Sequence, residues 1–298
     1  LANQTHSRRH LPRWLGLAIS PSSGLWQSGM SGLVLAGGGH SHALVLRRWA
    51  MQPSKRPKAL ITLVSRTSTA LYSGMLPGLI AGIYQRDQVA VNLRDLADQA
   101  GVALVVAEIN GLDLHQQQLR LDQRPVLPYE HLSLNLGAVT STSPETTSEL
   151  VPIKPLEPAL DFLVKQDEQM GNQAFATSPF QVVGSGLAAV ETVFALRQRW
   201  PRRPLMLRFR PKHLKPVLIK ALREASIQIL EANELDQAAL KTTPGLLCTG
   251  SRAPHWLASS GLPCCSNSGR IRTETSLQVT GQPQLFAAGD CAVIDAHP

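Results

Sequence analysis

Three consecutive glycines, Gly37 to Gly39, follow directly on a short apolar run at residues 33–36. A helical apolar pattern begins immediately after them and continues over residues 40–51. This order predicts a buried strand, a tight turn and a helix start, which together form the first unit of a dinucleotide-binding βαβ fold. The glycines would let the backbone approach a pyrophosphate, and the helix N-terminus would offer N–H groups to it.

A second glycine turn follows another apolar run, at residues 180–183. Gly184 and Gly186 fit the pattern G-x-G-x-x-A, in which Ala189 at the third position still lets the helix pack closely on the strand. Two such turns in one chain predict two dinucleotide sites.

The strand predicted after the second turn, over residues 205–210, ends in basic side chains. These are Arg208 and Arg210, with Lys212 close behind. Basic residues at this place favour the 2′-phosphate of NADP(H) over a bare ribose. The alternative is that they are solvated surface residues, as most arginines are, and the sequence leaves both interpretations open.

The strand predicted after the first turn, over residues 59–64, ends differently from its usual pattern. An acidic residue that binds ribose hydroxyls is expected there, but this chain has Ser65 and Arg66. The sequence therefore leaves ribose recognition by a carboxylate in doubt.

The last predicted strand, over residues 284–288, runs into Gly289 and Asp290. Such a turn can direct a carboxylate and backbone amides at a hydroxylated chain such as ribitol. The remaining predicted elements are strands at 102–106, 129–137, 227–230 and 245–250, helices at 93–100, 155–170 and 214–224, a hairpin-like stretch at 111–121 and a loop at 72–78.

These elements predict an α/β chain of two Rossmann-like units with parallel sheets. The second unit is inserted in the first, because the chain returns to the first unit for its Gly-Asp turn. The predicted boundaries are 30–137 plus 268–298 for the first unit, 138–177 for a linker and helix, 178–267 for the second unit, and 1–29 for a disordered or non-native extension before Met30.

The composition is typical of a globular protein, with 43% hydrophobic residues and a net charge of +8. The basic residues are spread out, which suits anionic ligands but not nucleic acid, since a nucleic-acid surface needs clustered basic residues with aromatic residues among them. No apolar run approaches the roughly 18 residues of a membrane span. We therefore expect neither a nucleic-acid partner nor a membrane span.

The cysteines form no C-x-x-C or C-x4-C pair, so the sequence predicts neither a zinc site nor a redox dithiol. His40 and His42 have no partner at zinc-ligand spacing, so we interpret them as loop residues at the pyrophosphate. Cysteine usage of this kind suits a reducing, cytoplasmic compartment. The cysteines are Cys248, Cys264, Cys265 and Cys291.

Three motifs together resemble one family of flavoproteins. They are the segment 37–43, read G-G-G-H-S-H-A, the segment 72–78, read Y-S-G-M-L-P-G, and the segment 288–292, read A-G-D-C-A. They are similar to the NADH-dehydrogenase-like members of the pyridine nucleotide-disulfide oxidoreductase superfamily that occur fused to, or beside, selenide, water dikinase in cyanobacteria and some other organisms.

The resemblance implies FAD on the first unit and NAD(P)H on the second. The candidate residues toward FAD are Gly37, Gly39, His40, Ser41, Ser65, Arg66, Tyr72, Ser73, Gly74, Met75, Leu76, Pro77, Gly289 and Asp290. The candidate residues toward NAD(P)H are Gly184, Gly186, Glu191, Arg208, Thr249 and Gly250.

The resemblance implies a hydride transfer from nicotinamide to flavin, and then onward transfer to a quinone or another small-molecule acceptor. No side chain needs to act as a nucleophile, so no catalytic residue is assigned. Family members continue past the Gly-Asp turn, whereas this sequence ends at Pro298, which predicts a C-terminally truncated chain with a partly built flavin site. The alternatives are a non-catalytic flavin- or nucleotide-binding module linked to selenium metabolism, or an inactive remnant.

Overall fold

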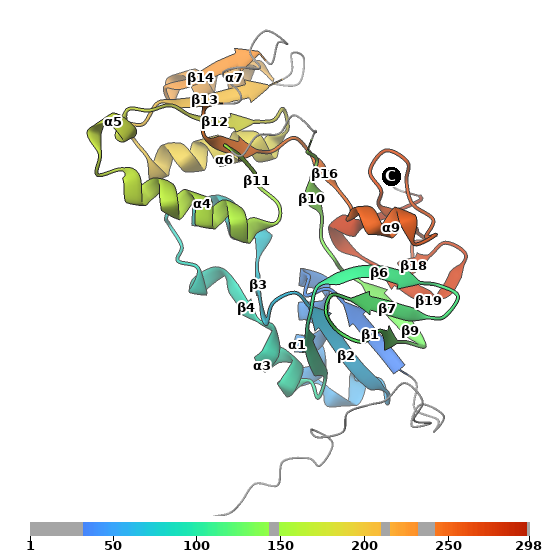
Figure 1. Ribbon diagram of the computed structural model, residues 1–298. Coiled ribbons are helices and arrows are strands. Elements are labelled where there is room, and N and C mark those ends of the chain that lie inside the picture. Colours follow the sequence, from blue (N-terminus) through green and yellow to red (C-terminus); the bar gives the residue numbers. More distant parts are fainter. Residues whose placement is uncertain (1–31, 143–148, 210–214, 232–241, 297–298) are drawn as a thin grey trace, which may run out of the picture.

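The computed structural model describes residues 32–142, 149–209, 215–231 and 242–296, which form two α/β units (Figure 1). Strands from both the beginning and the end of the described chain share one sheet, and the strands between them form another. This confirms the predicted α/β class with one Rossmann-like unit inserted in the other. The predicted N-terminal extension, Arg210 and Lys212 lie outside the described residues.

The first unit is built on an eight-stranded sheet in the order β20-β17-β18-β19-β9-β1-β2-β5. The neighbours from β19 to β5 all pair in parallel, as in dinucleotide-binding folds. The strands are β1 (Gly32–Ala36), β2 (Leu60–Ser65), β5 (Ala103–Val106), β9 (His131–Leu134), β17 (Ile271–Thr273), β18 (Gln278–Val279), β19 (Gln282–Ala287) and β20 (Ala292–Ile294).

Side chains of a strand alternate between the two faces of the sheet, so apolar side chains lie on both faces. A layer of other elements covers each face. Leu35 of β1 belongs to the core under the helices, whereas its neighbours Val34 and Ala36 belong to the opposite core. The helical layer is α1 (His40–Met51) and α3 (Leu93–Gln99), and the other layer is α9 (His255–Ser259) with the small sheet of β6 (Ile109–Asp113), β7 (Gln118–Leu121) and β8 (Leu127–Pro128).

The second unit has a five-stranded parallel sheet in the order β11-β15-β12-β13-β14. Every residue of β13 is buried, as expected of a parallel strand covered on both faces. The elements are β11 (Leu150–Pro152), β12 (Phe180–Val183), β13 (Leu205–Phe209), β14 (Ile227–Glu231), β15 (Gly245–Leu247), α4 (Leu156–Gln169), α5 (Gln173–Ala176), α6 (Leu187–Arg199) and α7 (Pro216–Glu224).

The connections between the units differ from the predicted boundaries. The segment predicted as a linker and helix, 138–177, begins with β10 (Val139–Thr140), which pairs with β16 (Ser251–Arg252), and continues into β11. Ala253 and Leu257, which the prediction gave to the second unit, lie in the core of the first. Pairing between distant segments sets these boundaries, and it leaves little local signal in the sequence.

The segment predicted as a loop at residues 72–78 is helical. It forms the 3-10 turn η3 (Ser73–Met75) and the helix α2 (Leu76–Ile80). Pro77 lies in the first turn of α2, where its missing N–H costs no hydrogen bond. Leu79 and Ile80 are buried in the core of the second unit, where α2 packs on α6. The prediction was wrong because Gly and Pro were read only as loop residues.

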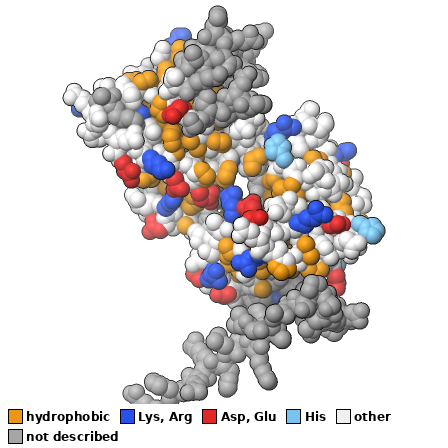
Figure 2. Space-filling model, viewed as in Figure 1, with side chains coloured by type: hydrophobic (Ala, Val, Ile, Leu, Met, Phe, Trp, Pro, Cys, Tyr) orange, Lys and Arg blue, Asp and Glu red, His pale blue; other side chains and the backbone are white. Residues whose placement is uncertain are grey.

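The remaining elements are short. β3 (Thr69–Leu71) and β4 (Ala90–Asn92) form an antiparallel pair next to the 3-10 turn η4 (Asp87–Val89), and two further 3-10 turns are η2 (Pro53–Lys55) and η6 (Gly289–Cys291). Within the described ranges, the helices are too short or too polar to cross a membrane. On the face in Figure 2, Lys and Arg side chains are interspersed with Asp and Glu, so that face carries no patch of one sign.

Candidate functional site

A cavity of about 560 Å³ opens beside the carboxyl ends of β1, β2 and β9. The strand order reverses at this place, because β2 and β9 flank β1, and open α/β sheets bind ligands at such points. The volume lies within the usual range of small-molecule sites. Ten of the predicted cofactor-binding residues line it: Gly37, Gly39, His40, Ser41, Ser65, Arg66, Tyr72, Ser73, Gly289 and Asp290.

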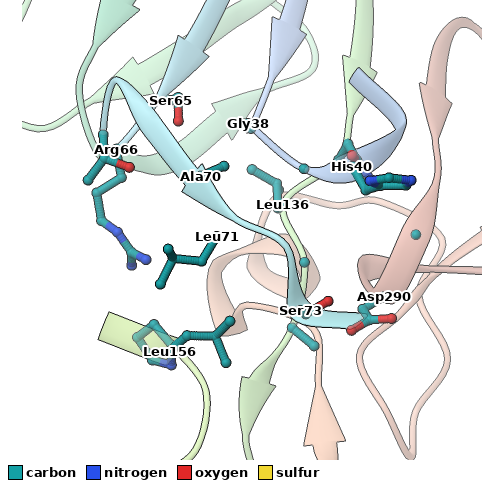
Figure 3. A pocket seen from close by; sticks show the side chains of 18 of the residues that line it. Gly38, His40, Ser65, Arg66, Ala70, Leu71, Ser73, Leu136, Leu156 and Asp290 are labelled. Carbon is teal, nitrogen blue, oxygen red and sulfur yellow. The ribbon is translucent and has the colours of Figure 1, made fainter. Parts of the chain in front are cut away.

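Figure 3 shows lining residues on both sides of the glycine turn. Ser65 and Arg66 lie at one end of the view, and His40 and Asp290 lie at the other, with Gly38 between them. The second unit also contributes to the wall, through residues 154–157 at the start of α4. The site is therefore long, and it is bounded by both units.

The three glycines of the first turn lie very close to their neighbours. Gly37 has φ +100°, and a Cβ there would lie 2.4 Å from the backbone oxygen of Asn135. A Cβ on Gly39 would lie 2.1 Å from Asn135 Oδ1, and one on Gly38 would lie 2.6 Å from Ser65 Oγ. Close packing against the Asn135 backbone thus requires Gly37 and Gly39, whether or not a pyrophosphate approaches them, whereas Gly38 meets only side-chain atoms.

Asn135 is buried and joins three segments of the first unit. Its Oδ1 accepts from the N–H groups of Ser41 at 3.1 Å and His42 at 3.4 Å, and its Nδ2 donates to the oxygen of Ala288 at 2.7 Å. Two N–H groups at the start of α1 are therefore used within the protein. The expectation that the helix end offers N–H groups to a ligand therefore does not extend to these two.

His42 is a buried residue of α1 and does not line the cavity. Nδ1 lies 2.7 Å from the carbonyl oxygen of Gly37, so it donates, and Nε2 lies 2.8 Å from Ser133 Oγ and accepts. Burial lowers the pKa of His42 to about 4, although the Gly37 hydrogen bond opposes the shift. The interpretation of His42 as a loop residue at the pyrophosphate was therefore wrong.

His40 and Tyr72 do face the cavity, and they contact each other. Their ring centroids are 4.8 Å apart with the planes tilted by 30°. His40 begins α1 and Tyr72 follows β3, so this contact closes the wall of the cavity between the glycine turn and the segment leading to α2.

Asp290 lies in η6 at the edge of the cavity and is paired with a lysine from the other unit. Its Oδ2 is 2.5 Å from Lys154 Nζ, and Arg270 Nε donates to its backbone oxygen at 3.1 Å. The carboxylate itself is half exposed, with a side-chain accessibility of 51%. It is consequently held in place yet open to a ligand.

Arg66 lies between two carboxylates at the other end. Its guanidinium is 3.8 Å from Glu108 and 3.4 Å from Glu157, and all three residues line the cavity. Glu108 follows β5, whereas Glu157 belongs to α4 of the second unit. No acidic residue ends β2, but Glu108, which follows the neighbouring strand β5, brings a carboxylate to the same edge of the sheet.

Sequence reasoning missed Glu108, Asn135, Lys154 and Glu157. None of them belongs to a local motif. Glu108 stands just after the predicted strand 102–106, as Ser65 does after 59–64, and Asn135 lies near the carboxyl end of the predicted strand 129–137, so the rule that ligands bind at those ends could have selected them. Nothing in the sequence indicates that Lys154 reaches Asp290.

Four predicted residues of the segment 72–78 do not line the cavity. Met75 and Leu76 pack against the core of the second unit instead. The helical conformation turns them away from the first glycine turn. The four are Gly74, Met75, Leu76 and Pro77.

The second glycine turn is more open than the first. Gly184 is closed in, because a Cβ there would lie 2.3 Å from the oxygen of Cys248, but no described atom lies within 4 Å of a Cβ built on Gly186. Glu191, one turn into α6, is exposed. Thr249 and Gly250 are also exposed, and both bond to Ser141, through Thr249 Oγ1 at 2.5 Å and the Gly250 oxygen at 3.0 Å.

Arg208 is only 3% exposed, so the interpretation of this residue as a solvated surface arginine was wrong. Its Nε donates to Gln181 Oε1 at 2.7 Å, and Gln181 Nε2 donates to the oxygen of Thr243. This buried network lies within the sheet of the second unit.

The cysteines are all free thiols. Burial raises the pKa of Cys291 to about 11, and it does the same for Cys248 in the second unit. Cys291 contacts the Leu136 N–H and the Ala288 oxygen, so it is a protonated packing residue under the cavity. Among the described residues, no group of three His, Cys, Asp or Glu side chains is arranged to hold a metal.

Comparisons with known proteins give distant relatives. No protein-family model matches the chain. Ferroptosis suppressor protein 1 of Homo sapiens is 26% identical over 215 residues, which is 61% of this chain and 55% of that protein. Type II NADH:quinone oxidoreductase NdhA of Mycobacterium tuberculosis is 32% identical over 96 residues, which is 31% of this chain and 20% of that protein.

Among solved structures, reduced Bacillus anthracis CoADR-RHD superposes with a TM-score of 0.72 at 18% identity. The match covers 89% of this chain and 51% of that one. The chain has a pyridine nucleotide-disulfide oxidoreductase-like fold. It spans about half or less of the length of the curated relatives that it matches.

Proposed function

We propose that the first unit binds FAD, that the second binds NAD(P)H, and that the two together pass a hydride from nicotinamide to flavin. One observation carries the proposal: a single long cavity joins the first glycine turn, the end of β2 and the Gly289–Asp290 turn at the point where the strand order reverses. Bound FAD would supply the two-electron redox chemistry.

The residues present suit such a cofactor. Hydroxyl and carboxylate groups line the cavity at Ser65 and Ser73 and at Asp290, as a chain of sugar and phosphate groups requires. Asp290 would accept hydrogen bonds from ribitol hydroxyls, and its ion pair with Lys154 holds this carboxylate in position. The apolar side chains of Leu71 and Leu156 would exclude water from the same wall.

The open position at Gly186 supports nucleotide binding by the second unit. A backbone without a side chain there can approach a pyrophosphate, which then lies at the N-terminus of the 13-residue helix α6. The buried position of Arg208 gives a 2′-phosphate site less support than the sequence did, so the proposal leaves NADH and NADPH as alternatives.

The proposed acceptor is a quinone or another small molecule. The support is the similarity to a type II NADH:quinone oxidoreductase of Mycobacterium tuberculosis over 31% of this chain. We also propose association with selenide, water dikinase and a cytoplasmic place for the protein. The first is supported by the three family-like motifs alone, and the second by the four free cysteines.

The experiment is an absorbance scan of the full chain mixed with FAD, followed by anaerobic addition of NADH or NADPH. Bound flavin that bleaches on addition of either nucleotide supports the proposal and ranks the two donors. Bound flavin that does not bleach favours a non-catalytic binding module. A protein that binds no flavin contradicts the proposal.

Two variants separate the units in this experiment. Asp290→Asn should weaken FAD binding, because it removes the carboxylate charge at the cavity edge. Gly186→Val should leave FAD bound but abolish bleaching, because the branched side chain would keep the backbone away from the nucleotide. Equal effects of both variants on both ligands would argue against separate sites.

A further inference from the structure

At the end of β2 the chain lacks the acidic residue that dinucleotide-binding folds use for ribose hydroxyls. The two residues at that place are Ser65 and Arg66. Neither can offer a carboxylate: Ser65 has a single, nearly buried hydroxyl, and a guanidinium has only N–H donors, so it cannot accept a hydrogen bond. A carboxylate that accepts from both hydroxyls of a ribose at this edge therefore has to come from another element.

We propose that Glu108 supplies this acceptor and binds the hydroxyls of the ribose next to the adenine. The inference rests on the proposed function, because it assumes that an adenine dinucleotide occupies the first unit. Glu108 follows β5, which is the parallel neighbour of β2.

The register of the sheet brings Glu108 to the right place. Ser65 lies opposite Val106, and the next residue, Ala107, donates its N–H to the oxygen of Ser65 at 2.9 Å. Glu108 thus leaves the sheet just beyond the level of Ser65, at the same carboxyl edge. Both residues line the same cavity as Gly38.

The surroundings of Glu108 leave its carboxylate available to a ligand. Its side chain is 51% exposed, and its contact with Arg66 is an exposed ion pair at 3.8 Å, which contributes little to stability. A ribose presents two adjacent hydroxyl donors, and a carboxylate has two acceptor oxygens. Arg66 would offset the repulsion between this carboxylate and a pyrophosphate.

Glu157 is the natural control, since it also lines the cavity and contacts Arg66, at 3.4 Å. It belongs to α4 of the second unit and not to the edge of the first sheet. Removing its charge changes the pairing of Arg66 without altering the carboxylate of Glu108.

The test measures the affinity of the full chain for FAD, ADP and 2′,3′-dideoxy-ADP by calorimetry. Glu108→Gln should weaken FAD and ADP binding about tenfold, since a hydrogen bond to a charged group is lost, and it should leave dideoxy-ADP binding unchanged. Glu157→Gln should change each affinity by less than about twofold.

The outcomes distinguish this inference from the proposed function. Binding of FAD that is unaltered in Glu108→Gln overturns the inference and leaves the proposed function standing. An equal loss for ADP and dideoxy-ADP, or a loss confined to Glu157→Gln, also overturns it. If the wild-type protein binds neither FAD nor ADP, the proposed function is overturned together with the inference.

Discussion

The glycine turns of the two units start from similar local patterns, with a buried strand before them and a helix after them, but their surroundings differ. In the first unit, Gly37 and Gly39 would both collide with Asn135 if they carried a side chain. In the second, Gly184 is closed against Cys248, whereas Gly186 faces open space among the described residues. The first turn is packed against Asn135 of its own unit, whereas the second turn leaves the backbone at Gly186 open.

This difference shows that a glycine motif has two physical uses. One is to let segments of the protein pack closely, and the other is to let a ligand approach the backbone. Substitutions at the two kinds of position should therefore affect different quantities, namely the free energy of unfolding at the first turn and the nucleotide affinity at the second.

The largest effect is expected for Gly37→Ala. The new residue would need φ near +100° and would place Cβ 2.4 Å from a backbone oxygen, which cannot move away easily. Backbone strain and overpacking together should lower the free energy of unfolding by about 3 kcal/mol or more. Urea denaturation without added flavin measures this, and a loss below about 1 kcal/mol would show that the turn can relax.

The next effect concerns pH and the buried His42. Its pKa of about 4 in the folded protein lies below the ordinary value of 6.5, so the unfolded chain binds more protons between these two values. The stability that the neutral His42 contributes is then fully present above pH 6.5. It is lost as the pH falls toward 4, which lowers the free energy of unfolding by on the order of 3 kcal/mol in total.

Urea denaturation at intervals from pH 7.5 to 4.5 checks this prediction. Other groups also titrate in this window, so the comparison is between the wild-type protein and His42→Gln. The variant should be less stable at neutral pH but should lose less stability on acidification. Parallel pH profiles for the two proteins would contradict a buried neutral imidazole.

A smaller loss is expected for Asn135→Leu. The substitution leaves the N–H groups of Ser41 and His42 and the oxygen of Ala288 without their partner, which should cost about 2 kcal/mol. Asn110→Leu is the matched control, because Asn110 lines the same cavity but is exposed, and it should change stability by less than about 0.5 kcal/mol. Equal losses would mean that Asn135 does not organise the first turn.

The smallest effect on stability is expected for Gly186→Ala. With φ −90° at this residue and open space around it, alanine fits the backbone, so the change should stay within about 0.5 kcal/mol. Titration with NADH and NADPH should nevertheless show weaker binding, since the methyl group stands where the backbone would meet a pyrophosphate. Unaltered affinity for both nucleotides would contradict the claim that the backbone at Gly186 contacts a nucleotide.

The residues 33–51 show what a sequence can predict. A strand at 33–36 and a helix at 40–51 were expected, and the structure has β1 at Gly32–Ala36 and α1 at His40–Met51. The signals are local there, since apolar runs and glycines specify the turn by themselves. The segment around Pro77 shows the limit, because the same residue types occur in a loop and in the first turn of a helix.

The sequence by itself determined the α/β class, the two glycine turns and the return of the chain to its first unit. Only the tertiary structure decided that Asn135 fills the space beside Gly39, that Glu108 reaches the edge left without an acid on β2, and that Lys154 meets Asp290. The physical reason is distance along the chain. Local backbone preferences appear in neighbouring residues, whereas these contacts join residues that sheet register and unit packing bring together.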